Sequence, residues 1–233
     1  MRLHYLQHVP FEGLGNIETW AKNKGFHITR THLFDNEPLP STDDFEWLVV
    51  MGGPMNIYEE TGYPWLVREK KFIEECLKRD KFVLGVCLGG QLIADVLGGR
   101  VVKNKEKEIG WFPVSLTERE GVDSPFFKGI LSPFIAFHWH EDRFELPASC
   151  ARLAESQGCS HQAFAYNNQA VGLQFHIDLT CEGVEKLIQH CGEGLSASRY
   201  VQTADEMVSN PAAFEKISET LETFLDNCQI IKI

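Results

Sequence analysis

The stretch Lys81-Phe-Val-Leu-Gly-Val-Cys-Leu-Gly-Gly-Gln-Leu-Ile-Ala-Asp-Val-Leu-Gly-Gly99 decides the fold. Its first part, Phe82 to Val86, is a short apolar run of the length typical of a buried parallel strand. Its second part, Leu88 to Leu97, has the length of a helix, which Gly98-Gly99 would end. A strand that leads directly into a helix is typical of an α/β fold, and Cys87 falls on the turn between the two elements.

The residues before this stretch alternate short strands with helices. We expect strands over residues 3–9, 26–34 and 45–51. We expect helices over residues 16–24 and 64–79. Such alternation indicates a parallel sheet with right-handed crossovers. After residue 100 the pattern is rich in strands, including 109–116, 134–139 and a hairpin at Asn167-Asn168, and helices return after Thr180. The sequence therefore predicts an α/β fold with an open, mostly parallel sheet flanked by helices and a strand-rich second half.

Composition limits the size of the core and the kind of partner. A chain of 233 residues with 43% hydrophobic residues can bury one sizeable core, and we expect a single domain over residues 1–233. The formal net charge is -11, and no cluster of lysine and arginine offers the basic stripe that nucleic acid requires. The charged run Lys103-Asn-Lys-Glu-Lys-Glu108 is interpreted as a solvated connection between elements.

The sequence also argues against secretion and against a membrane span. Its first residues lack the apolar core of a signal peptide, and the apolar stretch 81–99 is interrupted by Gln91, Asp95 and glycines. The seven cysteines include no Cys-x-x-Cys pair and fit a reducing compartment better than a disulfide framework. We therefore expect a cytoplasmic protein without a membrane or nucleic-acid partner.

Cys87 has the neighbours that a nucleophile elbow needs. In Gly85-Val-Cys-Leu-Gly89, the glycines on either side of the cysteine allow the strand and the helix to approach closely around a strained turn. Such a turn presents the thiol at the carboxyl end of the sheet and at a helix N-terminus, where the helix dipole favours the thiolate. We predict that Cys87 is a nucleophile; the alternative is a buried structural cysteine.

A histidine and an acid near the end of a later strand could complete the site. The apolar segment Ala170 to Asp178 places His176 and Asp178 on one face, because side chains of a strand alternate. Asp178 could then hold the imidazole in one tautomer while the other ring nitrogen faces Cys87. Alternatively, His176 only ends the strand and Asp178 caps the helix that begins near Thr180.

Three separated motifs resemble one known family. Along the chain they are Met51-Gly-Gly-Pro54, Gly85-Val-Cys-Leu-Gly-Gly-Gln91 and Gln174-Phe-His-Ile-Asp178, in the order found in the class I glutamine amidotransferases. The chain looks like a stand-alone branch of that family, similar to GMP synthase glutaminase domains and plant γ-glutamyl peptidases. The resemblance implies a flavodoxin-like fold with C-terminal helices from about residue 180. Asp178 stands where the family usually has glutamate.

The resemblance also implies a reaction and a role for each matched residue. The implied reaction is hydrolysis of the γ-glutamyl amide of glutamine or of a γ-glutamyl compound, through a cysteine thioester and without cofactor or metal. The nucleophile, base and orienting acid would be Cys87, His176 and Asp178. The oxyanion-hole residues would be Gly53 and Leu88, and the substrate-binding residues Gln91 and Gly52. The amine could pass to an acceptor or synthase subunit; alternatively, the chain is a γ-glutamyl peptidase that acts alone.

Other classes of function stay open at this stage. In His138-Trp-His-Glu-Asp142, strand periodicity places both imidazoles on one face, and the adjacent carboxylates could complete the metal site of a metallohydrolase. A third hypothesis is a non-catalytic flavodoxin-like module that keeps the architecture alone.

Overall fold

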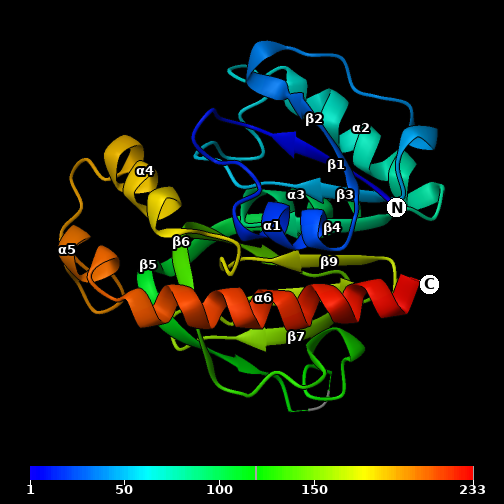
Figure 1. Ribbon diagram of the computed structural model, residues 1–233. Helices are drawn as coiled ribbons and strands as arrows, with labels where there is room; N and C mark the ends of the chain where they lie inside the picture. The colour runs from blue at the N-terminus through cyan, green and yellow to red at the C-terminus, as the bar shows by residue number, and fades with distance from the viewer. Residues whose placement is uncertain (119, 233) are drawn as a thin grey trace.

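The computed structural model describes residues 1–118 and 120–232, in which nine strands form one sheet flanked by helices (Figure 1). The strands are β1 (Arg2–Gln7), β2 (His27–His32), β3 (Trp47–Val50), β4 (Phe82–Val86), β5 (Arg100–Leu116), β6 (Phe134–Glu145), β7 (Ala151–Glu155), β8 (Ala163–Tyr166) and β9 (Ala170–Leu173). The helices are α1 (Asn16–Asn23), α2 (Trp65–Lys78), α3 (Leu88–Val96), α4 (Cys181–Cys191), α5 (Ala204–Val208) and α6 (Pro211–Lys232).

The sheet has a parallel half and an antiparallel half, in the order β2-β1-β3-β4-β9-β8-β7-β5-β6. The neighbours from β2 to β9 pair in parallel, and those from β9 to β6 pair antiparallel. The predicted α/β architecture and the strand-rich second half are confirmed. The parallel half matters for the site because its strands end at one edge, where the loops that follow them meet.

Helices cover both faces of the parallel half (Figure 1). One core cluster packs α1 and α6 against Trp47 and Val49 of β3, and a second packs α2 and α3 against Leu48 and Val50. Successive residues of β3 therefore face different cores, as expected for a strand that is buried on both sides. Among the helices of the described residues, none combines the length and hydropathy that crossing a bilayer requires.

The prediction for the charged run was wrong. Lys103 to Glu108 lies within β5, which pairs with β6 on both sides of a register shift between Lys103 and Glu108. Lys103, Lys105, Glu106 and Lys107 are exposed, so the run is solvated, but its backbone belongs to a long ribbon rather than to a connection. Exposed lysine and glutamate carry little apolar periodicity, which is why the pattern did not indicate a strand.

Other boundaries differ by a few residues. The predicted strand 26–34 ends at His32, where Leu33–Asp35 form a 3₁₀ turn. The hairpin at Asn167-Asn168 joins β8 to β9, with Asn167 at a φ of 51°. The strand expected to reach Asp178 ends at Leu173, and the residues beyond it continue as an irregular segment bridged to β6 through Phe137 and His176.

Candidate active site

Cys87 lies on a sharp turn between β4 and α3. Its φ and ψ are 51° and -106°, a conformation that L-residues rarely adopt and that stores backbone strain. The turn is possible because a Cβ on Gly89 would lie 2.0 Å from the carbonyl oxygen of Val50, and a Cβ on Gly85 would lie 2.4 Å from the backbone of Gly89. The elbow geometry expected from the spacing of these glycines is therefore present.

A cavity of about 630 Å³ opens beside this turn. The sequence-predicted residues that line it are Cys87, Leu88, Gln91, Gly53 and His176. Other walls come from Glu12, from the loop 54–59, from α4 with Leu187 and His190, and from the β5–β6 ribbon with Ile109 and Trp139. Gly52 and Asp178 are not among the lining residues: Gly52 lies beside His176 and Asp178 is hydrogen-bonded to His176.

His176 and Asp178 form a buried pair. Nδ1 of His176 lies 3.1 Å from Oδ1 of Asp178, and each residue is only 2% exposed. Burial opposes protonation of His176, but the charge and hydrogen bond of Asp178, together with Cys87, raise the pKa of His176 well above its usual value. Thr180, rather than Asp178, caps α4, so the alternative assignment of Asp178 as a helix cap was wrong.

Two glutamines connect α3 to the thiol. Gln174 Nε2 donates to Cys87 Sγ at 3.6 Å, and Gln91 Nε2 donates to Gln174 Oε1 at 3.2 Å. The thiol in turn lies 3.9 Å from the carbonyl oxygen of Trp139. Sequence reasoning places Gln91 at the site but gives no role to Gln174, although Gln174 lies only two residues before His176.

A second buried pair, His8 and Glu69, is hydrogen-bonded to the Gly52-Gly53 loop. Nδ1 of His8 lies 2.9 Å from the carbonyl oxygen of Gly52, and Nε2 lies 2.8 Å from Oε1 of Glu69. Burial lowers the pKa of His8, but the adjacent Glu69 and Gly52 carbonyl raise it more, so the net shift is upward. Because a trans peptide points its C=O and N–H in opposite directions, His8 fixes the direction of the Gly53 N–H. Sequence reasoning missed His8 and Glu69.

This contact gives a testable expectation. Replacing both members of the pair, His8→Leu with Glu69→Leu, avoids leaving a buried charge unpaired and should lower kcat about tenfold, with little change in KM. The combination His8→Asn with Glu69→Leu keeps an N–H donor near the Gly52 carbonyl and should recover most of that loss. Steady-state kinetics of the two double variants measure both values. Equal rates for the two double variants would contradict a role for the hydrogen bond to Gly52.

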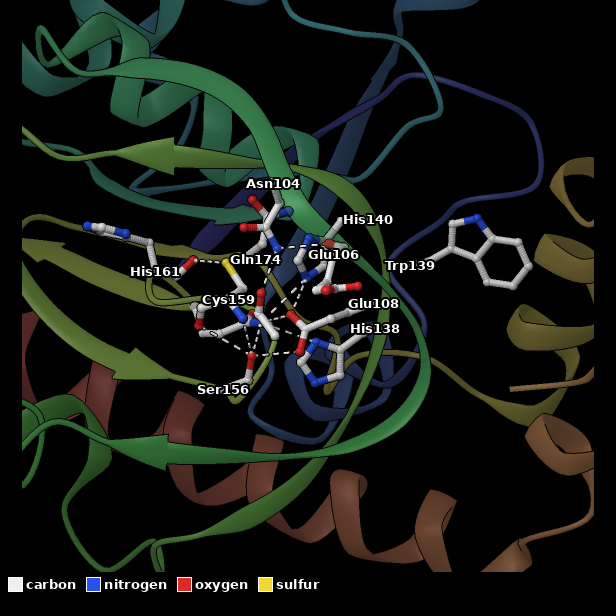
Figure 2. Close-up of polar contacts among 12 residues, drawn as sticks. Asn104, Glu106, Glu108, His138, Trp139, His140, Ser156, Cys159, His161 and Gln174 are labelled. Atoms are coloured by element: carbon white, nitrogen blue, oxygen red, sulfur yellow. Dashed lines mark hydrogen bonds and ion pairs between the residues drawn. The ribbon is translucent and has the colours of Figure 1, made fainter. Parts of the chain in front are cut away.

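A second polar cluster lies under the β5–β6 ribbon (Figure 2). Glu108, His138 and His140 are buried, and their candidate ligand atoms lie within 4.8 Å of one another. Figure 2 shows both histidines turned toward Glu108, while Trp139 points to the opposite side. The histidines share a face as expected, but the expected adjacent carboxylates do not join them. Glu141 pairs with Lys107, and Asp142 accepts a hydrogen bond from Asn56.

Hydrogen bonds from Gln162 and Ser156 hold this cluster, while Nε2 of His138 and Oε1 of Gln162 are buried without a hydrogen-bond partner among the described residues. Nε2 of Gln162 lies 2.7 Å from Oε2 of Glu108 and 3.4 Å from a ring nitrogen of each histidine. Oγ of Ser156 donates to the other oxygen of Glu108 at 2.6 Å. A cation among these ligands would have to displace the Gln162 amide, so the donor set fits a polar network better than a metal site.

The family model for class-I glutamine amidotransferases matches residues 18–188. The chain belongs to this family. It is 36% identical to the glutamine amidotransferase-like protein YfeJ of Salmonella typhimurium, over 97% of this chain and 96% of YfeJ. It is 28% identical to one subunit of the glutamine-hydrolysing GMP synthase of Sulfurisphaera tokodaii, over 64% of this chain and 77% of that protein.

Solved structures agree with this assignment. A crystal structure of a glutamine amidotransferase from Thermotoga maritima superposes with a TM-score of 0.89, at 30% identity, over 98% of this chain and 97% of that one. The predicted family and its flavodoxin-like fold are thereby confirmed. Membership in the family supports glutamine amide hydrolysis as the general chemistry of the chain.

Proposed function

We propose that the chain hydrolyses the γ-glutamyl amide of glutamine, or of a related γ-glutamyl compound, through a thioester on Cys87. One observation carries the proposal: Cys87 on its strained turn and His176, which is hydrogen-bonded to buried Asp178, line the same cavity. A nucleophile, a base and an orienting acid are the groups that this chemistry needs. The match to the amidotransferase family supports the same reaction.

The proton path follows from the hydrogen bonds of His176. Asp178 accepts from Nδ1–H, which leaves Nε2 available to take the proton of the Cys87 thiol. The sulfur attacks the amide carbon, and His176 gives its proton to the departing nitrogen. His176 then activates a water molecule that attacks the thioester and releases glutamate. Gln174 stabilises the thiolate through its N–H donor to Sγ.

Backbone N–H groups of Gly53 and Leu88 are proposed to hold the oxyanion. In the described part of the chain no backbone carbonyl accepts from either N–H, and both residues line the cavity. Leu88 is the first residue of α3, where N–H groups lack partners within the helix and the helix dipole favours negative charge. Gln91 and Gly52 are proposed to lie near the bound glutamyl group, with Gly52 acting through its peptide bond to Gly53.

Substrate and partner are part of the proposal. The volume of the cavity is larger than the side chain of glutamine requires, and it lies within the usual range for larger ligands. This volume favours a γ-glutamyl compound as substrate. One alternative is that the chain acts alone as a hydrolase or peptidase; YfeJ, matched along 96% of its length, supports amidotransferase-like chemistry without specifying a substrate. The likeness to part of a GMP synthase supports the alternative, a separate acceptor subunit that receives ammonia.

An assay of the purified protein alone separates these alternatives. We expect glutamate release from glutamine, glutathione or γ-glutamyl peptides without any added protein. Release from a γ-glutamyl peptide exceeding that from glutamine would identify a peptidase. Activity on glutamine that appears only with an added synthase subunit would support the amidotransferase alternative. If none of these compounds released glutamate either with or without that subunit, the result would contradict the proposal.

The sheet supports a proposal on domain organisation, and the cysteines support one on location. One sheet runs through the described residues, and we propose a single domain over residues 1–233. All seven cysteines are free thiols, which suits a reducing compartment, and we propose the cytoplasm.

Thiol labelling provides a direct check on Cys87. The pKa values of six thiols are raised, chiefly by burial, to about 12 for Cys76 and Cys159, and Glu185 adds to the rise at Cys181. Cys87 should react first with iodoacetamide at neutral pH because it lies at the N-terminus of α3 and lines the cavity beside His176, and a saturating γ-glutamyl ligand should slow the reaction. Peptide mapping after brief alkylation measures the order. Exposed Cys181 is the internal control, because its labelling should not respond to the ligand; faster labelling of Cys181 than of Cys87 would contradict the expectation.

A further inference from the structure

The loop between β1 and α1 places the carboxyl group of Glu12 beside the candidate catalytic residues. Glu12 is 7% exposed and lines the same cavity as Cys87 and His176. Its Oε2 lies 2.4 Å from the position that a Cβ on Gly52 would occupy, and Cε1 of His176 lies 3.4 Å from the same position. The missing side chain of Gly52 therefore provides the space in which Glu12 approaches His176.

The chain provides no hydrogen-bond donor to this carboxyl group among the described residues. The titratable groups that face it are His176 and Asp178, His8 from the start of the same loop, and Cys191 from α4. Burial raises the pKa of Glu12 to about 7 although the two histidines lower it. A buried carboxylate without a donor is costly, so a group that donates to it from the cavity would be bound favourably.

We propose that Glu12 binds the amine that leaves the γ-glutamyl group and so forms a leaving-amine subsite next to His176. The inference rests on the proposed function of Cys87 and His176. The departing nitrogen receives its proton from His176, so it must leave from the side of the imidazole, where Glu12 lies. An amine or ammonium supplies the N–H donors that Glu12 lacks, whereas a substrate carboxylate would be repelled.

The proton balance of this step is simple. When the C–S bond forms and the C–N bond breaks, the thiol proton passes through His176 to the leaving nitrogen, which departs as a neutral amine. That amine is more basic than the Glu12 carboxylate and takes the proton of Glu12, or one from water where Glu12 is already ionised. The resulting ammonium pairs with the carboxylate. Since an ammonium has no lone pair to attack the thioester, the pair favours hydrolysis over return to the amide.

The test compares two leaving groups. Glutamine releases ammonia, whereas the γ-ethyl ester of glutamate releases ethanol, which does not become a cation. We expect Glu12→Gln to lower kcat/KM for glutamine about tenfold and that for the ester less than about twofold. Glu18→Gln, which changes an exposed acid on α1, is the matched control and should leave both values unchanged. Glutamate release measures all of them, and thermal unfolding reports the fold of each variant.

The outcomes separate this inference from the proposed function. Equal losses on both substrates would mean that Glu12 acts through His176 or on the glutamyl half, and would overturn the subsite. Unchanged values on both would overturn it as well. If the wild-type protein released glutamate from neither substrate, the proposed function would fail and the subsite with it. If the wild-type protein is active on both substrates and Cys87→Ala is active on neither, the proposed function holds. The comparison of Glu12→Gln with the wild-type protein then tests the subsite alone.

Discussion

Replacing Cys87 with alanine is expected to reduce glutamate release at least about 10⁴-fold, because Cys87 is the thiol at the strained turn. Cys191 also lines the cavity, but it lies at the end of α4 and burial raises its pKa, so it should not replace the nucleophile. His176→Ala should cost a similar factor, since it leaves the thiol without a base. The residues act as one unit, so the double variant should be no slower than either single variant. Steady-state rates with the best γ-glutamyl substrate measure all three.

The fold of these variants provides the control. Cys87 occupies a strained turn, and alanine in its place keeps the backbone requirement while removing the sulfur, so thermal stability should change little. A single variant with a rate near that of the wild-type protein would contradict the assignment. In that case the family resemblance would describe the fold, and the non-catalytic alternative would regain support.

The sequence could predict the parts of the site that depend on local spacing. The elbow at Cys87 follows from glycines two residues away on each side, and the pairing of His176 with Asp178 was expected from their two-residue separation. The pairing is present although the strand boundary was wrong: β9 ends at Leu173, and the irregular segment beyond it still brings Nδ1 of His176 to Oδ1 of Asp178.

Other residues could not be found in this way because their partners are distant in the chain. His8 meets Glu69 across 61 residues, and Gln162 reaches Glu108 across 54. Glu108 also ends a run of charged residues, whose exposed members indicated a solvated segment, while its own side chain is fully buried. A single sequence contains no period or motif that connects such pairs, so only the folded chain reveals them.

Asp178, the acid of the proposed triad, stands where the resemblance to the family leads us to expect glutamate. We expect Asp178→Asn to lower kcat about 10²-fold, less than the loss in Cys87→Ala. An asparagine amide can donate to Nδ1 of His176, which favours the tautomer with a proton on Nε2, and that tautomer cannot take the proton of the thiol. Asp178→Glu should retain more activity, since it keeps a carboxylate that accepts from Nδ1.

A second measurement distinguishes an orienting role from a purely structural one. Asp178 is the largest influence that raises the pKa of His176 against the effect of burial, so the pKa of His176 should fall in Asp178→Asn, as followed by NMR titration of the imidazole. An unchanged rate together with an unchanged pKa would mean that another acid orients His176. Glu182, four residues after Asp178, is exposed and paired with Lys186. Glu12, which lines the cavity with His176, would therefore be the acid to replace next.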